Sequence, residues 1–251
     1  MSRLYSVINM DIMNSRNMKN RESIQNNIKV YLNSISQNYQ SILVAPITMT
    51  LGDEWQIVLR DISESYNIFK EIQLFLKEHD INCYGGLGIG SINTSISDDT
   101  REMDGEAFIF AREALEIAKS TTRFYNEYMS AKENRFYFKG IKPNFKKYNI
   151  SDSLDEVALT VEYDEVSIND MINTLIENNE VLESKITIKQ REIIKLYEKY
   201  GSYNSIVKEF KNTSKPSISQ KLNSSNYFLV MHNRKIIKNL LKLYERELME
   251  K

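Results

Sequence analysis

Cysteine, histidine, proline and glycine are all scarce in this chain. Its 251 residues hold one cysteine, Cys83, and two histidines, which excludes an internal disulfide and leaves too few ligands for a zinc cluster. No apolar run approaches the roughly 20 residues of a membrane span, and no basic and apolar leader follows Met1. The fractions of 41% hydrophobic and 27% charged residues are typical of a folded globular protein. We therefore expect a cytoplasmic protein that does not enter a membrane.

The net charge of −1 conceals two parts of opposite sign. Residues 187–251 carry 14 lysines and arginines against 6 acidic residues, whereas residues 1–186 carry 19 against 28. A basic excess confined to one end is typical of a segment that binds a polyanion such as DNA. A solvated, lysine-rich helix surface is the simpler explanation of the charge taken alone.

The first part of the chain alternates between strand-like and helix-like patterns. Strands are predicted at residues 4–11, 41–50, 55–59, 82–94 and 135–139, and helices at 20–40, 62–77 and 105–121. This alternation predicts an α/β domain in which helices pack against a sheet. The polar segment 146–165 divides the chain into a domain at 1–150, a linker with a connecting helix at 151–186, and a domain at 187–251. Ser167 or Asn169 is expected to cap the connecting helix.

Two aspartates are candidates for a metal site. Asp11 ends an apolar strand, where an unpaired charge is costly. Asp53 lies in a predicted hairpin turn, in which Gly52 is expected to supply unusual backbone angles. If the hairpin lies beside the first strand, both carboxylates and the carbonyl of Ile12 form an oxygen ligand set suited to Mg²⁺ or Mn²⁺. Alternatively each aspartate serves its own turn, which is the commoner role for either residue alone.

Two further features bear on phosphate binding. Asn14, Ser15 and Arg16 fall in a turn that enters a helix, where backbone N–H groups can bind phosphates. The glycine-rich run 85–90 is not a dinucleotide fingerprint, because the residues after it do not begin a helix. It predicts a strand where backbones pack closely, with a ligand above it as one reason. Lys139 is a weaker phosphate candidate, and a solvated lysine is the preferred interpretation.

Several motifs, taken together and in order, resemble the SatD family. They are INMDIMNSR at 8–16, IT at 47–48, LGDEWQ at 51–56, GLGIG at 86–90, and DGEAF at 104–108 followed by Ala111-Arg112. The C-terminal segment also resembles the helix-turn-helix tail of that family. The chain departs from the family pattern at Trp55, where phenylalanine is typical, and at Tyr84-Gly85, which replaces an arginine–aromatic pair. The second departure removes a cation that could bind phosphate.

The first domain is more distantly similar to the palm domains of class III nucleotide cyclases and diguanylate cyclases. Asp11-Ile12 and Gly52-Asp53 match the two positions that hold metal ions in those palms. The resemblance implies a ferredoxin-like sheet with helices, and a nucleoside triphosphate held by Mg²⁺ or Mn²⁺. It also places Arg112 near the position of a transition-state arginine, whereas Phe108 stands where a polar residue is usual.

The basic C-terminal part carries the pattern of an all-α helix-turn-helix domain. Thr187 is expected to cap a helix at 188–200, Gly201 to end it in a left-handed conformation, and Ser202 to cap a shorter second helix. A turn at 212–214 then leads to a third helix that begins at Lys215-Pro216. The third helix is predicted to enter the DNA major groove and to present Lys215, Ser217, Ser219, Gln220 and Lys221. A helical bundle for dimerisation, with 227–248 as a partner helix, is the alternative.

Three functions remain open. The chain is a DNA-binding regulator whose palm-like domain binds a nucleotide with a metal ion, or an active nucleotidyl cyclase or nucleotidyltransferase with a targeting tail. In the third hypothesis the palm is an inert dimerisation scaffold, which the carboxylate pair argues against. Tyr84-Gly85 and Phe108 argue against catalysis, because phosphate chemistry needs cations and polar groups. We expect DNA, a nucleotide and a second copy of the chain as partners.

Overall fold

A five-stranded mixed sheet forms the centre of the molecule. The computed structural model describes residues 3–18, 20–120, 135–141 and 167–249. The strand order is β2–β3–β1–β4–β5, and all neighbours are antiparallel except β4 and β5. The strands are β1 (Tyr5–Ile12), β2 (Thr48–Leu51), β3 (Glu54–Leu59), β4 (Cys83–Gly90) and β5 (Arg135–Gly140).

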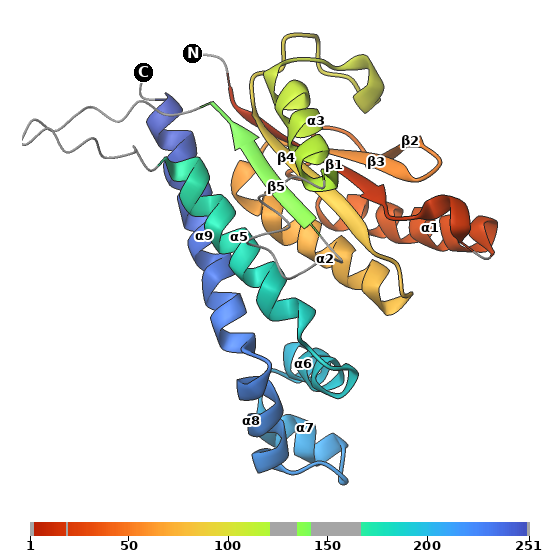
Figure 1. Ribbon diagram of the computed structural model, residues 1–251, viewed down its shortest axis with the longest axis vertical. Coiled ribbons are helices and arrows are strands. Elements are labelled where there is room, and N and C mark those ends of the chain that lie inside the picture. Colours follow the sequence, from red (N-terminus) through yellow and green to blue (C-terminus); the bar gives the residue numbers. More distant parts are fainter. Residues whose placement is uncertain (1–2, 19, 121–134, 142–166, 250–251) are drawn as a thin grey trace, which may run out of the picture.

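Helices cover both faces of this sheet (Figure 1). Side chains of α1 (Arg21–Asn38) and α2 (Ser65–Glu78) share the larger apolar core with one face, whereas α3 (Glu106–Lys119) packs on the other. Because side chains alternate along a strand, Ile8 and Met10 of β1 enter the larger core and Val7 enters the smaller one. Short 3₁₀ helices lie at η1 (Ser15–Asn17), η2 (Ile62–Glu64) and η3 (Thr100–Glu102). The predicted sheet flanked by helices is confirmed.

The predicted strand at 41–50 is wrong over most of its length. Only Thr48–Leu51 forms a strand, and Leu43 makes a single bridge to Leu59. Pro46 lacks a backbone N–H and therefore cannot continue a ladder through this segment. The N–H of Arg60 instead donates to the carbonyl of Ile42 at 2.7 Å, so β-rich residues here form a bent loop along the end of β3.

Glycine serves different purposes in the hairpin and in β4. Gly52 lies in the turn as predicted, but its φ is not positive, so the expectation of unusual backbone angles there is wrong. The amide of Gln25 donates to the Gly52 carbonyl and ties the turn to α1. In β4, a Cβ on Gly86 or Gly88 would lie 2.2 Å from backbone atoms of α3. The close approach predicted for this strand is confirmed, and the neighbour is a helix.

Helix α5 (Ile168–Ser184) covers the outer edge of β5. Ser167 caps the helix in a capping box with Asp170, as one of the two predicted caps. The other candidate, Asn169, is buried and donates to the carbonyl of Gly140 at 3.0 Å. One turn later, Asn173 accepts from the N–H of Phe138 at 2.8 Å and donates to its carbonyl at 2.9 Å. These two amides satisfy backbone groups that an open edge strand leaves unpaired.

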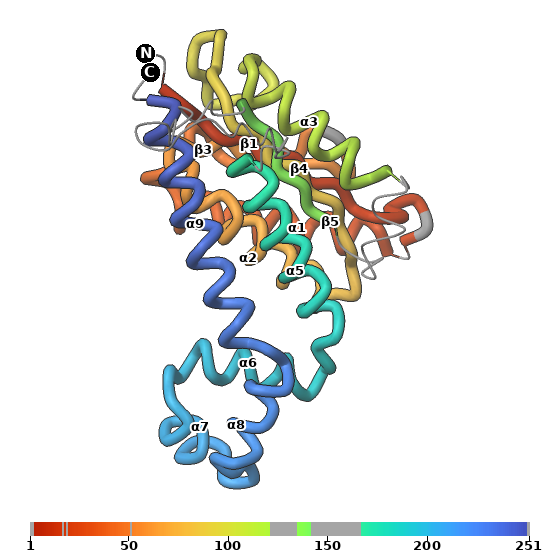
Figure 2. Tube along the Cα trace, turned by 60° about the vertical axis from the view of Figure 1, so that its left-hand side comes forward, coloured from red at the N-terminus to blue at the C-terminus, as the bar shows by residue number. Residues whose placement is uncertain are grey.

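Helix α9 (Tyr227–Met249) runs beside α5, and both extend from the sheet towards the last helices (Figures 1 and 2). Its residues Ile237, Leu241 and Tyr244 belong to the same apolar core as the sheet. The apolar face of this predicted partner helix is therefore occupied by its own chain. Helices α5 and α9, which the sequence places in the linker and in the C-terminal domain, thus complete the apolar core of the first domain.

A buried ionic network joins these helices to α2. Lys70, fully buried, lies 3.0 Å from a carboxylate oxygen of Glu180 and is also paired with Glu183. Arg234 of α9 reaches Glu183 from the other side at 2.7 Å. Burial disfavours both charged partners, yet the neighbouring carboxylates raise the pKa of Lys70 and the two cations lower that of Glu183. Two cations and two carboxylates thus balance one another in the interior of the protein.

Three short helices form a separate small core at the basic end. They are α6 (Ile188–Tyr200), α7 (Tyr203–Glu209) and α8 (Lys215–Ser224), and their buried residues are Ile193, Ile206, Ile218 and Leu222. The predicted caps at Thr187 and Ser202 and the left-handed Gly201 (φ 70°) are confirmed. Among the described helices, none is long and apolar enough to cross a membrane. The predicted boundary at 146–165 lies outside the described residues.

Candidate functional site

The two aspartates lie close together at one end of β1. The backbone N–H of Ile12 donates to the carbonyl of Asp53 at 3.1 Å, which holds the hairpin turn beside the end of this strand. Asp11, Ile12 and Asp53, together with Asn14, Ser15, Arg16 and Glu54, line one cavity of about 520 Å³. The structure therefore brings together the residues predicted to bind a metal ion and those predicted to bind phosphate.

The turn after β1 positions one of these carboxylates. Asn14 adopts a left-handed conformation (φ 54°), which asparagine tolerates better than most residues, and this reverses the chain into η1. Ser15 is then buried, and its hydroxyl donates to a carboxylate oxygen of Asp53. Arg16 is exposed and has no hydrogen bond or ion pair among the described residues. The turn thus offers one free cation at the rim of the cavity.

Lys119, at the end of α3, is the present counterion of the site. Its ammonium lies 2.6 Å from Asp11 and 3.3 Å from Glu54, which faces Asp11 across the β1–β3 pair. Partial burial raises the pKa of Asp11, the charges of Glu54 and Asp53 add to this rise, and Lys119 opposes it. Asp11 and Glu54 therefore share the Lys119 ammonium, and the Asp53 carboxylate lies near them without an ion pair to Lys119.

This donor set fits a hard divalent cation in part. Carboxylate and carbonyl oxygens are ligands that Mg²⁺ and Mn²⁺ prefer, and Mg²⁺ commonly takes only one or two carboxylates from the protein. Within the described ranges, no three His, Cys, Asp or Glu side chains converge closely enough to form a ready metal cluster. A cation would therefore bind with Asp11 and Asp53, and Lys119 would have to release Asp11.

A groove of about 600 Å³ lies against the cavity and shares Glu54 with it. Arg112 and Phe108 of α3 line one wall, and Arg112 is exposed without a hydrogen bond or ion pair among the described residues. The strands provide the other wall, where the Gln56 amide donates to the Asn9 side chain at 2.9 Å. Its volume is in the range of small-molecule sites, and its polar side chains suit a nucleoside.

Sequence reasoning missed Lys119, Glu54 and the Asn9–Gln56 pair. Helical spacing is the signal that could have identified Lys119. It follows Arg112 by seven residues, so both lie on the same face of α3. Glu54 and Gln56 follow Asp53 in the hairpin, and alternation along β3 places their side chains on the α3 face of the sheet. Lys139 pairs with Glu113 at 2.7 Å on the surface, as expected of a solvated lysine.

The residues predicted to contact DNA lie on α8 or at its start. Lys215 and Gln220 are exposed, whereas Ser217, Ser219 and Lys221 are partly buried. Ser214 caps the helix by accepting from the N–H of Ser217. None of these five residues forms an ion pair among the described residues, so the two lysines are free to meet an anion.

The fold and the site define a mixed α/β sheet protein with a carboxylate-lined cavity at one strand end and a helical C-terminal part. Residues 5–133 match the SatD family, and they include every residue of this cavity. The chain belongs to the SatD family. A comparison with curated proteins found no match.

Proposed function

We propose that this protein is a DNA-binding regulator whose first domain binds a nucleotide together with Mg²⁺ or Mn²⁺. The observation that carries the proposal is the shared cavity of Asp11 and Asp53 with the Asn14–Arg16 turn. The element order β-α-β-β-α-β and the strand order β2–β3–β1–β4 support a palm-like, ferredoxin-like interpretation of the sheet. In that interpretation the cavity lies where strand and hairpin carboxylates meet.

Each side chain has a role in this proposal. Asp11, Asp53 and the carbonyl of Ile12 hold the metal ion, which supplies charge neutralisation to the phosphates. Arg16 and the backbone N–H groups of the turn bind the phosphates directly. Once Lys119 releases Asp11, its ammonium is also available to a phosphate. The nucleoside lies in the adjoining groove, where the amides of Asn9 and Gln56 donate to and accept from a base.

The C-terminal helices α6–α8 serve as a helix-turn-helix unit in this proposal, with α8 as the recognition helix. The support comes from the basic excess of residues 187–251 and from two free lysines at Lys215 and Lys221 on one short helix. The occupied apolar face of α9 favours this role over a bundle that uses α9 for dimerisation. A homodimer that reads two half-sites remains part of the proposal.

Calorimetric titration of nucleoside triphosphates with Mn²⁺ tests the nucleotide site. We expect binding to the parent protein and at least about tenfold weaker binding to Asp53→Asn, because a metal ligand is lost. Asp80→Asn is a matched control, since Asp80 is exposed, does not line the cavity and has a positive φ (56°) that asparagine tolerates. Equal affinities for the parent and Asp53→Asn would refute the proposal.

An active nucleotidyl cyclase or nucleotidyltransferase is the second candidate. It is favoured by Arg112, a free cation in the groove, at which developing charge on a phosphate could be stabilised. Incubation with the four nucleoside triphosphates and Mn²⁺, followed by chromatography, distinguishes the two. The regulator leaves the triphosphates unchanged, whereas an enzyme releases a cyclic or linear product that Arg112→Ala no longer forms.

A further inference from the structure

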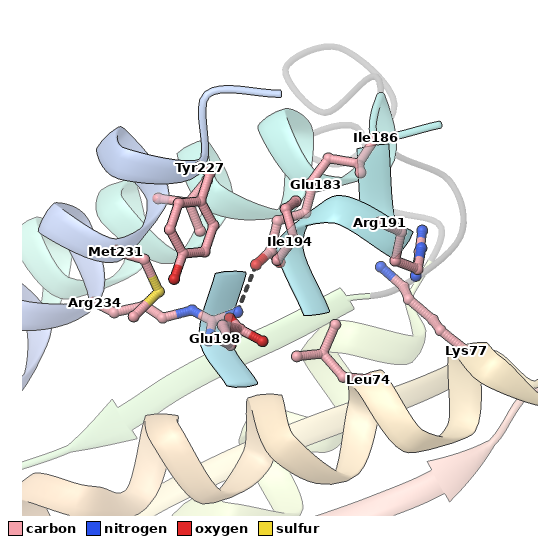
Figure 3. Close-up of a pocket in the computed structure, with 11 residues that line it drawn as sticks. Leu74, Lys77, Glu183, Ile186, Arg191, Ile194, Glu198, Tyr227, Met231 and Arg234 are labelled. Carbon is pink, nitrogen blue, oxygen red and sulfur yellow. Dashed lines mark hydrogen bonds and ion pairs between the residues drawn. The ribbon is translucent and has the colours of Figure 1, made fainter. Parts of the chain in front are cut away.

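A second cavity lies at the junction between the α/β part and the three-helix unit (Figure 3). Its walls come from α2, α5, α6 and α9, so residues far apart in the sequence enclose it together. The enclosed space of about 40 Å³ has room for about three water molecules. It lies apart from the Asp11–Asp53 cavity, with which it shares no residue.

The lining is apolar inside and cationic at one end. The apolar side chains are Leu74, Ile186, Ile194, Tyr227, Val230 and Met231. Lys77 of α2 and Arg191 of α6 also line the cavity, and neither has a hydrogen bond or ion pair among the described residues. Burial lowers the pKa of Lys77, and the positive charges of Lys70 and Arg191 lower it further, whereas the buried carboxylates of α5 oppose this fall. Two like charges therefore lie near each other, and among the described residues no carboxylate is in direct contact with either, so an anion between them would be favourable.

A third cation completes the arrangement. Arg234 donates to Glu183, as the dashed line in Figure 3 shows, but its buried Nε has no hydrogen-bond partner in the described part of the chain. The acidic residues of the lining are Glu183, already shared by Lys70 and Arg234, and the exposed Glu198. Positive charge therefore exceeds negative charge around the cavity when the buried network is included.

We infer that this cavity binds a small organic anion, with its apolar part between the helices and its charged group between Lys77 and Arg191. An inorganic anion would use the cations but leave the apolar walls without a partner. A neutral apolar compound would fill the walls but leave the like charges unpaired. A short-chain carboxylate satisfies both. Because the ligand contacts α2 and α6 at once, it favours one placement of the three-helix unit on the α/β part.

Calorimetric titration of the full chain with propanoate, a carboxylate of about the volume of three water molecules, tests this inference. We expect binding to the parent protein, at least about tenfold weaker binding of 1-propanol, and an affinity for inorganic phosphate no greater than that of 1-propanol. Arg191→Gln and Lys77→Gln should each weaken propanoate binding about tenfold, the equivalent of about 1.4 kcal/mol. Lys195→Gln is the matched control on α6, because Lys195 is paired with Glu78 outside the cavity.

The variants also report on the free protein. Removing one of two neighbouring like charges should leave the melting temperature unchanged or raise it, so loss of binding cannot be attributed to unfolding. Absence of propanoate binding, an affinity of Arg191→Gln and Lys77→Gln equal to that of the parent, or phosphate binding as tight as that of propanoate would each overturn the inference. Nucleotide binding at Asp53 is expected to be the same in these variants, so the two sites can fail independently.

Discussion

Lys70 tests the claim that α5 and α9 are part of the α/β core. Its ammonium is fully buried between Glu180 and Glu183, and Arg234 of α9 contacts the other carboxylate oxygen of Glu183. Substitution Lys70→Met keeps the length of the side chain but leaves two buried carboxylates beside one cation. Breaking a buried ion pair from one side typically costs about 3–5 kcal/mol, and we expect a loss of that size in the free energy of unfolding.

A compensating variant separates charge imbalance from lost packing. Lys70→Met with Glu180→Gln leaves Arg234 and Glu183 as a neutral pair, and we expect it to recover all but about 1–2 kcal/mol. Urea unfolding followed by circular dichroism measures both variants, with the slope checked for constancy. A cost below about 1 kcal/mol for Lys70→Met, or a double variant no more stable than the single one, would refute the assigned network.

The same network predicts how the stability of the protein depends on pH. In the parent protein, burial raises the pKa of Glu183, but Lys70 and Arg234 outweigh this and hold it well below the ordinary 4.5. Its stabilising contribution is therefore present above pH 4.5 and is lost as the pH falls towards the depressed value. Without Lys70, protonation of a buried carboxylate becomes favourable, so the deficit of Lys70→Met should shrink as the pH is lowered. A deficit that grows towards low pH would contradict this reasoning.

Three further predictions concern other parts of the chain. Burial raises the pKa of Glu177 to about 7, so the stability linked to its protonated form is lost as the pH rises through 7. In urea unfolding, Glu177→Gln should therefore be about 1–2 kcal/mol more stable than the parent at pH 8 and equally stable near pH 4. Gly88→Ala should cost about 3 kcal/mol or more because its Cβ meets the backbone of α3 at 2.2 Å, whereas Gly52→Ala, which meets only side chains at 3.3 Å or more, should cost less than about 1 kcal/mol. In the DNA proposal, replacing Lys215 and Lys221 by alanine should weaken binding and reduce the slope of log affinity against log salt by about 1 per lost phosphate contact; an unchanged slope would point away from α8.

The sequence predicted helices well where the spacing of apolar residues and the capping residues at the helix ends agreed. Thr187, Ser202 and Gly201 each have a side chain or a conformation that marks a helix end without help from distant residues. The segment 41–50 misled because its β-rich composition does not reveal that Pro46 and the bonds of Arg60 bend it away from the sheet. The composition of this segment indicates that its side chains are buried, but its backbone conformation depends on tertiary contacts.

The candidate site was predictable as far as its carboxylates, and less so for its counterion. Asp11 and Asp53 could be paired because a hairpin places its turn beside a neighbouring strand. Lys119 comes from α3, which packs on one face of β4. Its distance to Asp11 therefore depends on how closely α3 approaches Gly86 and Gly88. Such a distance follows from packing, which a single pattern of residues does not specify.

Binding of Mn²⁺ in the absence of nucleotide, followed by electron paramagnetic resonance, tests the central claim most directly. If the metal takes the place of the Lys119 ammonium beside Asp11, then Lys119→Met should bind Mn²⁺ more tightly than the parent. Asp53→Asn should bind it at least about tenfold more weakly. Identical Mn²⁺ affinities in the parent, Lys119→Met and Asp53→Asn would show that the cavity is not a metal site.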